Sequence, residues 1–298
     1  MPALFRKLVV VGVGLIGGSF ALALKRAGAV SEVVGVGRNA PSLDEALRLG
    51  IIDRIGTADR ETLRDADLVL LAIPVGQMAA AMRAIAPHLG ADTVVTDAGS
   101  TKASVIAAAR DAFPASFSQF VPAHPIAGAE RSGPAAAKPD LYVGRRVVIS
   151  PLAETSAAAR ARVEAAWLAC GARLSVMTPE SHDRIFATVS HLPHLLAYAL
   201  VHELCERDNA GQLFGFAASG FRDFTRIAGS HPEMWRDIFL ENRDALIAEL
   251  DRYVAKLDAL RALLDAGDGA ALERLLEDAS KARKNWTVDE DGSNDCGG

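Results

Sequence analysis

The residue with the clearest capacity for chemistry is His124, which lies in a segment rich in proline and glycine. The segment covers residues 121–133 and reads VPAHPIAGAERSG. Proline and glycine interrupt regular secondary structure, so we expect His124 to lie on a loop of fixed shape. Rigid scaffolds often carry reactive side chains on such loops. The segment therefore predicts a reactive histidine between two domains, facing a cofactor on one side and a substrate on the other.

A second candidate site is the glycine-rich sequence at residues 12–17, GVGLIG, which follows an apolar run and precedes a segment rich in Ala and Leu. A strand, a glycine turn and a helix form the dinucleotide-binding fingerprint, in which the turn brings backbone N–H groups to a pyrophosphate. A glycine-rich turn in another α/β protein is the alternative. The predicted cofactor-binding residues of this turn are Gly12, Gly14, Leu15, Ile16 and Gly17.

The end of the next predicted strand bears on the choice of cofactor. NAD sites usually carry an acidic residue about 20 residues beyond the glycines, where it accepts from the ribose 2'-hydroxyl. This chain has Gly37 there, followed by Arg38. An arginine without the carboxylate can bind a 2'-phosphate, which favours NADP over NAD. Arg38 stacking on adenine is compatible with either cofactor and stays open.

Several polar or rigid residues follow the predicted strands. Ligands of doubly wound sheets lie beyond the carboxyl ends of the strands, where Pro74, Ser100, Lys102 and His124 all fall. We expect Pro74 and Ser100 to border the cofactor. Ser100 could instead cap the helix that follows, and the two roles are compatible.

Histidines and arginines gather in the second half of the chain. One cluster holds His191 and His194, with His182 upstream, and another runs from Gly220 to Ser230. Metal binding is disfavoured because carboxylates and cysteines are missing at ligand spacing and nearby arginines would repel a cation. Arginine beside histidine suits an organic anion better.

The elements that must position these residues change character near residue 178. Short apolar runs predict strands at residues 7–11, 32–36, 66–72, 93–98, 145–150 and 173–177, most of them separated by helical segments. Helices are then expected at 180–204, interrupted by Pro193, and at 235–264, a long amphipathic stretch that needs a partner surface. We therefore expect domains at residues 1–177 and 178–286, and a disordered tail at 287–298.

Composition limits the remaining classes. A chain of 298 residues with 50% hydrophobic and 23% charged residues suits two globular domains, and its net charge of -5 argues against nucleic acid as a partner. The three cysteines lack metal or disulfide spacing. We found no membrane-spanning run and no signal peptide, so we expect a cytoplasmic protein.

Taken together, these motifs resemble the prephenate and arogenate (cyclohexadienyl) dehydrogenase family of tyrosine biosynthesis. The resemblance covers residues 5–285 and rests on the glycine turn, Thr96-Asp97 with Ser100 and Lys102, the HPIAG of residues 124–128, the SHLPH of residues 190–194, and residues 220–226. It implies a Rossmann-type α/β dinucleotide-binding domain followed by an all-α dimerisation domain. It also implies NAD(P)-dependent oxidative decarboxylation of a cyclohexadienyl acid by a homodimer.

The resemblance further implies roles for individual residues. His124 would be the catalytic histidine, with Ser100 beside it, and Arg226 would bind a substrate carboxylate. Trp235 would approach the pocket from the other subunit. The expected substrate-binding residues are Arg226, His191, His194, Arg222, Glu130 and Trp235.

Two other classes are compatible with part of the pattern. A β-hydroxyacid dehydrogenase or imine reductase shares the layout but relies on a lysine on the first long helix of its second domain, where this chain offers histidines. A non-catalytic NAD(P) sensor would explain the fold but not the polar groups that converge from separate segments.

Overall fold

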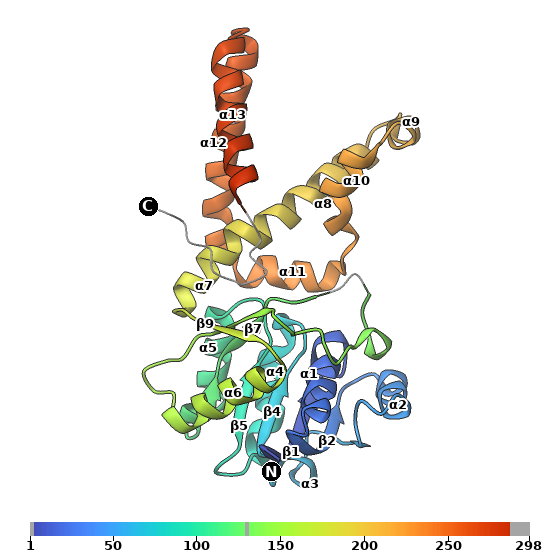
Figure 1. The fold of residues 1–298 in the computed structure, drawn as a ribbon, viewed down its shortest axis with the longest axis vertical. Coiled ribbons are helices and arrows are strands. Elements are labelled where there is room, and N and C mark those ends of the chain that lie inside the picture. Colours follow the sequence, from blue (N-terminus) through green and yellow to red (C-terminus); the bar gives the residue numbers. More distant parts are fainter. Residues whose placement is uncertain (1–2, 129–130, 287–298) are drawn as a thin grey trace.

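The protein has an α/β half that carries two helical arms (Figure 1). The computed structural model describes residues 3–128 and 131–286. Helix α11 lies across one end of the α/β half, and the arms project away from it. One arm contains α12 and α13, and the other contains α8, α9 and α10. This arrangement confirms the predicted order of a Rossmann-type α/β domain followed by an all-α region.

A parallel sheet forms the centre of the first half. Within the described residues its order is β3-β2-β1-β4-β5-β6, which is that of dinucleotide-binding folds. All residues of β4 and nearly all of β1 are buried because helices cover both faces, which explains their continuous apolar sequence. The strands are β1 (Phe5–Val11), β2 (Val30–Val36), β3 (Arg54–Ile55), β4 (Leu68–Leu71), β5 (Val94–Asp97) and β6 (Phe120–Val121).

A second, smaller sheet corrects the expectation that His124 lies on a loop. His124 is the middle residue of β7 (Ala123–Pro125), which pairs antiparallel with β8 (Arg146–Ile149), while β8 pairs in parallel with β9 (Arg173–Val176). His124 lies opposite Val148. Pro125 ends this short strand, so its lack of an N–H group is tolerated. The ladder fixes the backbone of His124 more firmly than a loop would.

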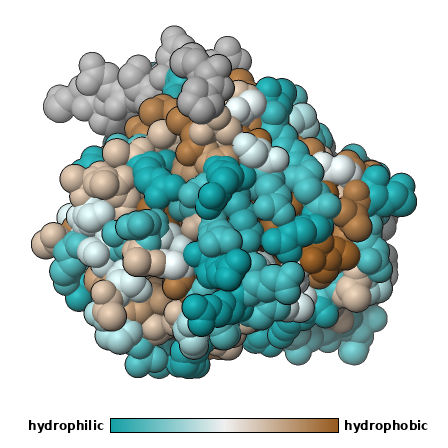
Figure 2. Space-filling model, turned by 90° about the horizontal axis from the view of Figure 1, so that it is seen from below, coloured by the Kyte–Doolittle hydropathy of each residue, from teal (hydrophilic) through white to brown (hydrophobic). Residues whose placement is uncertain are grey.

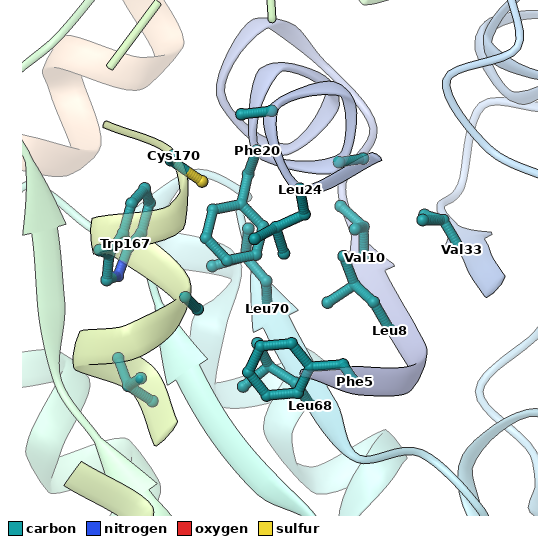
Figure 3. Packing of buried hydrophobic residues seen from close by; sticks show 14 of the residues in the cluster. Phe5, Leu8, Val10, Phe20, Leu24, Val33, Leu68, Leu70, Trp167 and Cys170 are labelled. Atoms are coloured by element: carbon teal, nitrogen blue, oxygen red, sulfur yellow. The ribbon is translucent and has the colours of Figure 1, made fainter. Parts of the chain in front are cut away.

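The helices of the first half pack on the parallel sheet in two clusters, and an aromatic contact lies in the cluster that holds α1, α2 and α6. The rings of Phe20 and Trp167 meet edge to face with centroids 4.6 Å apart, beside Leu70 and Cys170 (Figure 3). Tyr142 packs on Trp167 and donates a hydrogen bond to the Ile16 carbonyl at 2.6 Å, which ties the core to the glycine turn. These helices are α1 (Leu15–Arg26), α2 (Ala40–Arg48), α3 (Arg60–Leu63), α4 (Met78–Ile85), α5 (Ala103–Ala112) and α6 (Ala157–Ala169).

The prediction of one long helix at residues 235–264 is wrong, because the chain turns at Asn242 and forms two helices. Asn242 is buried with φ near -115° and separates α11 from α12. The local periodicity continues through this turn, so only tertiary contacts reveal it. The helices of the second half are α7 (Pro179–Phe186), α8 (Leu192–Cys205), α9 (Ala210–Gly215), α10 (Ser219–Thr225), α11 (Pro232–Glu241), α12 (Arg243–Asp265) and α13 (Gly269–Asn285).

The expected interruption near Pro193 takes the form of a π-helical segment at Ala187–His191. Proline lacks an N–H group, and its ring clashes with the carbonyl four residues earlier, which a wider π turn relieves. Helix α7, this segment and α8 form a run, Pro179–Cys205, that is long and apolar enough by length and composition alone to cross a membrane. Its residues His182, Asp183 and His191 are buried, so we assign the run to the fold of the helical half.

The face opposite the helical arms is mixed in character. Hydrophilic residues cover much of it, with smaller hydrophobic patches between them (Figure 2). The expected disordered tail at 287–298 lies outside the described residues, as does Cys296. Of the described cysteines, Cys170 is a buried free thiol and Cys205 an exposed one.

Candidate active site

The glycine turn between β1 and α1 has the geometry of a pyrophosphate site. Gly12 has φ of +96°, and a Cβ atom there would lie 2.4 Å from the Ala72 carbonyl oxygen. A Cβ atom on Gly17 would lie 2.7 Å from Val10, so this glycine lets α1 pack on β1. Gly14, at the N-terminus of α1, faces open space and has no side-chain cap. Free backbone N–H groups beside open space fit a dinucleotide phosphate.

Arg38 and Pro74 follow β2 and β4, the strands on either side of β1. Arg38 is exposed just after β2, and its Nη2 donates to Oε1 of Gln77 at 2.7 Å. Pro74 follows β4 and precedes the short helical turn Val75–Gln77. Because β2 and β4 lie on either side of β1, the contact between Arg38 and Gln77 spans the carboxyl end of β1.

Asp97 at the end of β5 and Lys102 in the segment that follows hydrogen-bond the backbone next to His124. Nζ of Lys102, fully buried, forms an ion pair with Asp97 and donates to the Ala123 carbonyl at 2.7 Å. Oδ1 of Asp97 accepts from the Ala123 backbone N–H at 3.1 Å. Both groups therefore hold the residue that precedes His124. Lys102 is a structural cation in this arrangement.

Ser100 lies half-buried in this segment, beyond the end of β5. The alternative that Ser100 caps α5 is wrong, because Lys102 occupies the N-cap position. The carboxylate of Asp183 accepts from the N–H groups of Lys102 and Ala103, each at 2.8 Å. A residue of the helical half thus caps a helix of the sheet domain.

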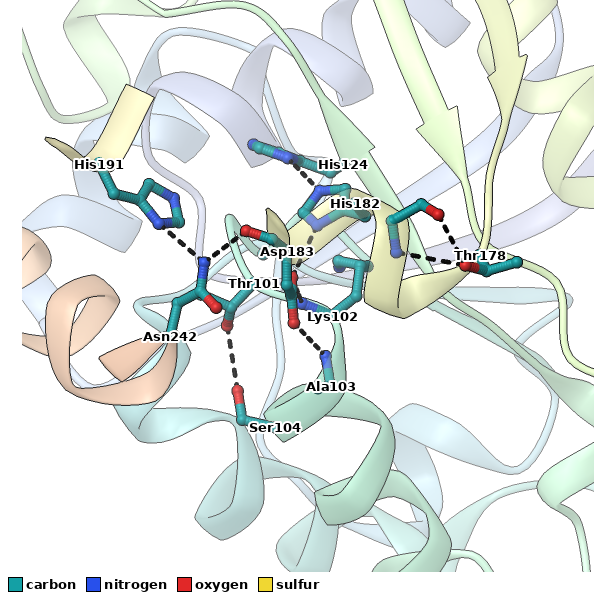
Figure 4. A network of polar contacts seen from close by, with 12 residues as sticks. Thr101, Lys102, Ala103, Ser104, His124, Thr178, His182, Asp183, His191 and Asn242 are labelled. Carbon is teal, nitrogen blue, oxygen red and sulfur yellow. Dashed lines mark hydrogen bonds and ion pairs between the residues drawn. The ribbon is translucent and has the colours of Figure 1, made fainter. Parts of the chain in front are cut away.

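A chain of hydrogen bonds runs from His124 to Asp183 (Figure 4). Nδ1 of His124 lies 2.8 Å from Nε2 of His182, and Nδ1 of His182 lies 2.7 Å from Oδ1 of Asp183. His124 also packs edge to face against Phe186, with ring centroids 4.9 Å apart. His182 is fully buried and His124 is half-buried.

The protonation of these groups follows from their surroundings. Burial lowers the pKa of His124 well below its usual 6.5, and the neighbouring His182, Lys102 and His191 lower it further. Burial also lowers the pKa of His182, although the hydrogen bond to Asp183 opposes this. Burial would raise the pKa of Asp183, but hydrogen bonds from His182 and two backbone N–H groups bring it below its usual value. At neutral pH both imidazoles are therefore neutral and Asp183 is a carboxylate.

His191 and His194 offer opposite hydrogen-bonding character. Nδ2 of Asn242 donates to Nδ1 of His191 at 3.0 Å, so the proton of the neutral His191 ring is on Nε2. Burial lowers the pKa of His191 to about 4, although Asp183 raises it in part. Nδ1 of His194 donates to the Ser190 carbonyl at 2.8 Å, which leaves Nε2 as an acceptor. Burial lowers the pKa of His194, and the hydrogen bond to Ser190 opposes this.

Trp235 stacks on His194 of its own chain, with ring centroids 3.6 Å apart and planes 20° apart. Trp235 therefore lies beside a pocket histidine within one chain, and its approach to the pocket of the other subunit stays a prediction. Helix α11 lies over the sheet domain of the same chain, where Trp235 and Ile238 join a cluster with Val75 and Met78. This packing holds Trp235 beside His194.

The arginines predicted to bind substrate differ in their setting. Arg226 begins the turn Arg226–Gly229 after α10, and its positive charge contributes to the lowered pKa of His194. Arg226 is thus close to the histidine pair. Arg222 is exposed one turn earlier on α10. Glu130 lies outside the described residues.

The sequence pattern did not assign roles to three residues of this network, His182, Asp183 and Asn242. The proximity of His182-Asp183 to SHLPH was visible, but their contact with His124 joins positions 58 residues apart. Among residues 3–128 and 131–286, no group of three or more His, Cys, Asp or Glu could hold a metal ion. The assembled groups can accept a proton, donate to an anion and bind a planar ring.

Two family models match successive parts of the chain. The model described as "Prephenate dehydrogenase, nucleotide-binding domain" matches residues 20–176, and "Prephenate dehydrogenase, dimerization domain" matches residues 178–278. A curated relative, the cyclohexadienyl dehydrogenase of Zymomonas mobilis, is 36% identical over 96% of this chain and 98% of its own length.

Solved structures of prephenate and arogenate dehydrogenases are also similar to this chain. Prephenate dehydrogenase from Aquifex aeolicus, in complex with hydroxyphenyl propionate and NAD+, superposes with a TM-score of 0.87 and 35% identity, covering 94% of this chain and 97% of that one. Synechocystis arogenate dehydrogenase superposes with a TM-score of 0.79 and 29% identity, covering 95% of this chain and all of that one.

Proposed function

We propose the roles of individual residues from the premise that this chain belongs to the prephenate dehydrogenase family. The chain is an NAD(P)-dependent oxidoreductase that oxidatively decarboxylates prephenate, L-arogenate or both. The products are 4-hydroxyphenylpyruvate and L-tyrosine, respectively, so the reaction belongs to tyrosine biosynthesis. The observation that carries the residue roles is the neutral, half-buried His124, which is held in β7 and hydrogen-bonded to His182.

His124 acts as the general base. A nicotinamide, when bound, supplies the acceptor for the hydride that leaves C4 of the substrate ring. Nε2 of His124 takes the proton of the C4 hydroxyl, and positioned base catalysis of this kind contributes about 100- to 10,000-fold. Ser100 lies beyond the end of β5, and we propose that its hydroxyl borders the reacting groups. Loss of the ring carboxylate as CO2 leaves its electron pair in the ring, which restores aromaticity and makes the step irreversible. The phenolate oxygen then takes the proton back from His124.

The helical half binds the rest of the substrate. We propose that Arg226 pairs with a substrate carboxylate and that the Nε2–H of His191 donates to an oxygen atom. Trp235, stacked on His194, forms a wall of the pocket. Arg222 and Glu130 complete the proposed set. Residues 1–177 would then form the cofactor domain and residues 178–286 the substrate and dimerisation domain.

The function is tested by incubating the enzyme with prephenate or L-arogenate and either NAD or NADP, while absorbance at 340 nm is followed. We expect cofactor reduction with at least one substrate. Absence of reduction with all four pairs would remove the proposed activity and favour the NAD(P)-sensor alternative. The lysine-dependent reductase alternative has little support, since Pro179–Cys205 contains no lysine.

We propose that NADP is preferred over NAD. Gly37 leaves no carboxylate to repel a 2'-phosphate, and Arg38 is exposed with Nη2 already oriented by Gln77. Arg38→Ala should raise KM for NADP about 10- to 100-fold, the range of a lost charge-assisted hydrogen bond, and leave KM for NAD nearly unchanged. Arg48→Ala, an exposed arginine at the end of α2, is the control. Equal effects on both cofactors would show that Arg38 stacks on adenine.

We also propose a homodimer assembled through the helical half and located in the cytoplasm. The match of residues 178–278 to a dimerization domain supports the dimer. Large apolar side chains are exposed along both arms, including Phe216, Phe224, Leu257 and Leu264. The unpaired thiols of Cys170 and Cys205 suit a reducing compartment.

A further inference from the structure

His182 and Asp183 lie behind the base, and their hydrogen bonds have defined directions. Asp183 is an ionised carboxylate that only accepts, and three N–H groups point to it, from Lys102, Ala103 and His182. The proton between His182 and Asp183 must therefore be on Nδ1 of His182. In a neutral ring this leaves Nε2 of His182 as an acceptor.

The same argument fixes the next ring. Nε2 of His182 can only accept, so Nδ1 of His124, 2.8 Å away, must carry the proton and donate it. The free electron pair of neutral His124 is then on Nε2, the nitrogen on the side of the ring turned away from His182 in Figure 4. With the other tautomer, Nε2 would carry a proton and could not act as a base.

We propose that Asp183 and His182 are positioning residues that hold His124 in its base-competent tautomer and stabilise the imidazolium that forms when it accepts the substrate proton. This assignment rests on the proposed function of His124. The proton arrives at Nε2 while the proton on Nδ1 stays hydrogen-bonded to His182. The positive charge is then separated from the Asp183 carboxylate by one imidazole, within a buried site where such a charge is otherwise costly.

Asp183 also connects the hydrogen bonds of His124 and His182 to the cofactor domain. Its two oxygens accept from the first N–H groups of α5, the helix that follows the segment from Asp97 to Lys102. That segment holds the backbone of Ala123 through Asp97 and Lys102. The segment after β5 therefore orients the ring of His124, through Asp183 and His182, and also the backbone that precedes His124. Asn242 holds the Asp183 carbonyl at 2.8 Å and completes the support.

The tautomer is tested first on the substrate-free dimer, labelled with 15N-histidine, by long-range 1H–15N NMR at pH 7. We expect the His124 proton on Nδ1 in the wild type and shared between Nδ1 and Nε2 in Asp183→Ala, because this variant removes the acceptor that fixes the proton of His182 on Nδ1. Asp59→Ala is the matched control, since Asp59 caps α3 through Thr62. A His124 proton that stayed wholly on Nδ1 in Asp183→Ala would overturn the proposal.

Kinetics of His182 variants give a second test that does not depend on the fold surviving loss of Asp183. His182→Phe keeps an aromatic ring beside Phe186 but removes the acceptor, so kcat should fall about 100- to 10,000-fold while substrate KM stays within threefold. His182→Gln, whose carbonyl can replace Nε2 as acceptor, should recover at least tenfold of the loss. Equal kcat for both variants, or a loss confined to KM, would contradict the proposal.

The two hypotheses fail in different ways. If the wild type reduced neither cofactor with either substrate, the proposed activity would be wrong, while the tautomer measured by NMR would still stand. If turnover were normal and the tautomer of His124 did not depend on Asp183, the base would remain and the positioning chain would be wrong.

Discussion

At the scale of single residues, the site depends on keeping His124 neutral. Its pKa lies well below 6.5 because its ring is largely removed from water and because His182, Lys102 and His191 disfavour a further charge. The carboxylates of Asp183 and Asp97 raise the pKa of His182 in part. A base with a lowered pKa is unprotonated throughout the neutral range.

The first prediction concerns His124 itself. Since the base must be unprotonated, kcat should be constant from pH 8 to about 6.5 and should fall only as the pH drops through the lowered pKa. His124→Asn should bind cofactor normally and lose at least tenfold in kcat at every pH, because Asn cannot accept a proton. Steady-state kinetics against pH, with cofactor binding measured by fluorescence, provide the check. A variant that keeps more than a tenth of wild-type kcat would exclude His124 as the base.

The second prediction concerns Arg226, whose positive charge lowers the pKa of His194. A bidentate, desolvated contact with a substrate carboxylate should make Arg226→Ala cost roughly 2 to 5 kcal/mol in binding, about 30- to 5,000-fold in KM, with little change in kcat. Arg226→Lys should recover part of the loss, since an ammonium group cannot form both hydrogen bonds.

Arg243→Ala, an exposed arginine at the start of α12, is the control for this experiment. A thermal melt of each variant shows whether the fold is retained. If KM of Arg226→Ala stayed within threefold of wild type, the carboxylate site would have to be sought at Arg222, His191 and His194.

At the scale of elements, the turn between α11 and α12 connects the arms to the active site. Nδ2 of Asn242 donates to the Asp183 carbonyl and to Nδ1 of His191. The same residue therefore ends one helix, starts another and orients a pocket histidine. Both acceptors are buried, so each needs this donor.

The third prediction follows from that geometry. Asn242→Ala should lower the free energy of unfolding by about 1 to 3 kcal/mol, the usual cost of leaving a buried acceptor unpaired. The measurement is urea unfolding at one protein concentration, since a dimer's stability depends on it. Asn209→Ala, an exposed position before α9, should change the free energy by no more than about 0.5 kcal/mol. Equal effects of the two substitutions would contradict the role given to Asn242.

At the scale of the whole molecule, the two helical arms of a single chain expose apolar side chains. Helices α8 and α12 extend away from the α/β half with exposed apolar side chains, and Phe216 at the end of α9 is 84% exposed. Surfaces of this kind usually mark an interface. The match to a dimerization domain covers α8, α9, α10, α12 and the first part of α13.

The fourth prediction is therefore a dimer in solution. Light scattering at micromolar concentration should give twice the mass of one chain. Leu257→Glu, in the middle of α12, should shift the protein toward monomer, whereas Leu168→Glu, equally apolar and exposed on α6 of the cofactor domain, should not. A wild-type monomer under these conditions would exclude the proposed assembly.

The sequence by itself determined the parts of the fold that depend on local physics. The glycine turn, the apolar strands and the helix Met78–Ile85 are specified by neighbouring residues, and these local signals identified the dinucleotide-binding half. The motifs around His124, His191 and His194 also identified the family. Position in the chain, chemical type and spacing were sufficient for these inferences.

Only the tertiary structure decided how the site is assembled. His124 lies in a strand because β8, more than 20 residues later, pairs with it, and its partner His182 is 58 residues away. Asp183 caps a helix 81 residues earlier in the chain, and Asn242 breaks a helix whose apolar period continues through it. Each of these features depends on hydrogen bonds between segments that meet only after folding, and local propensity contains no information about such meetings.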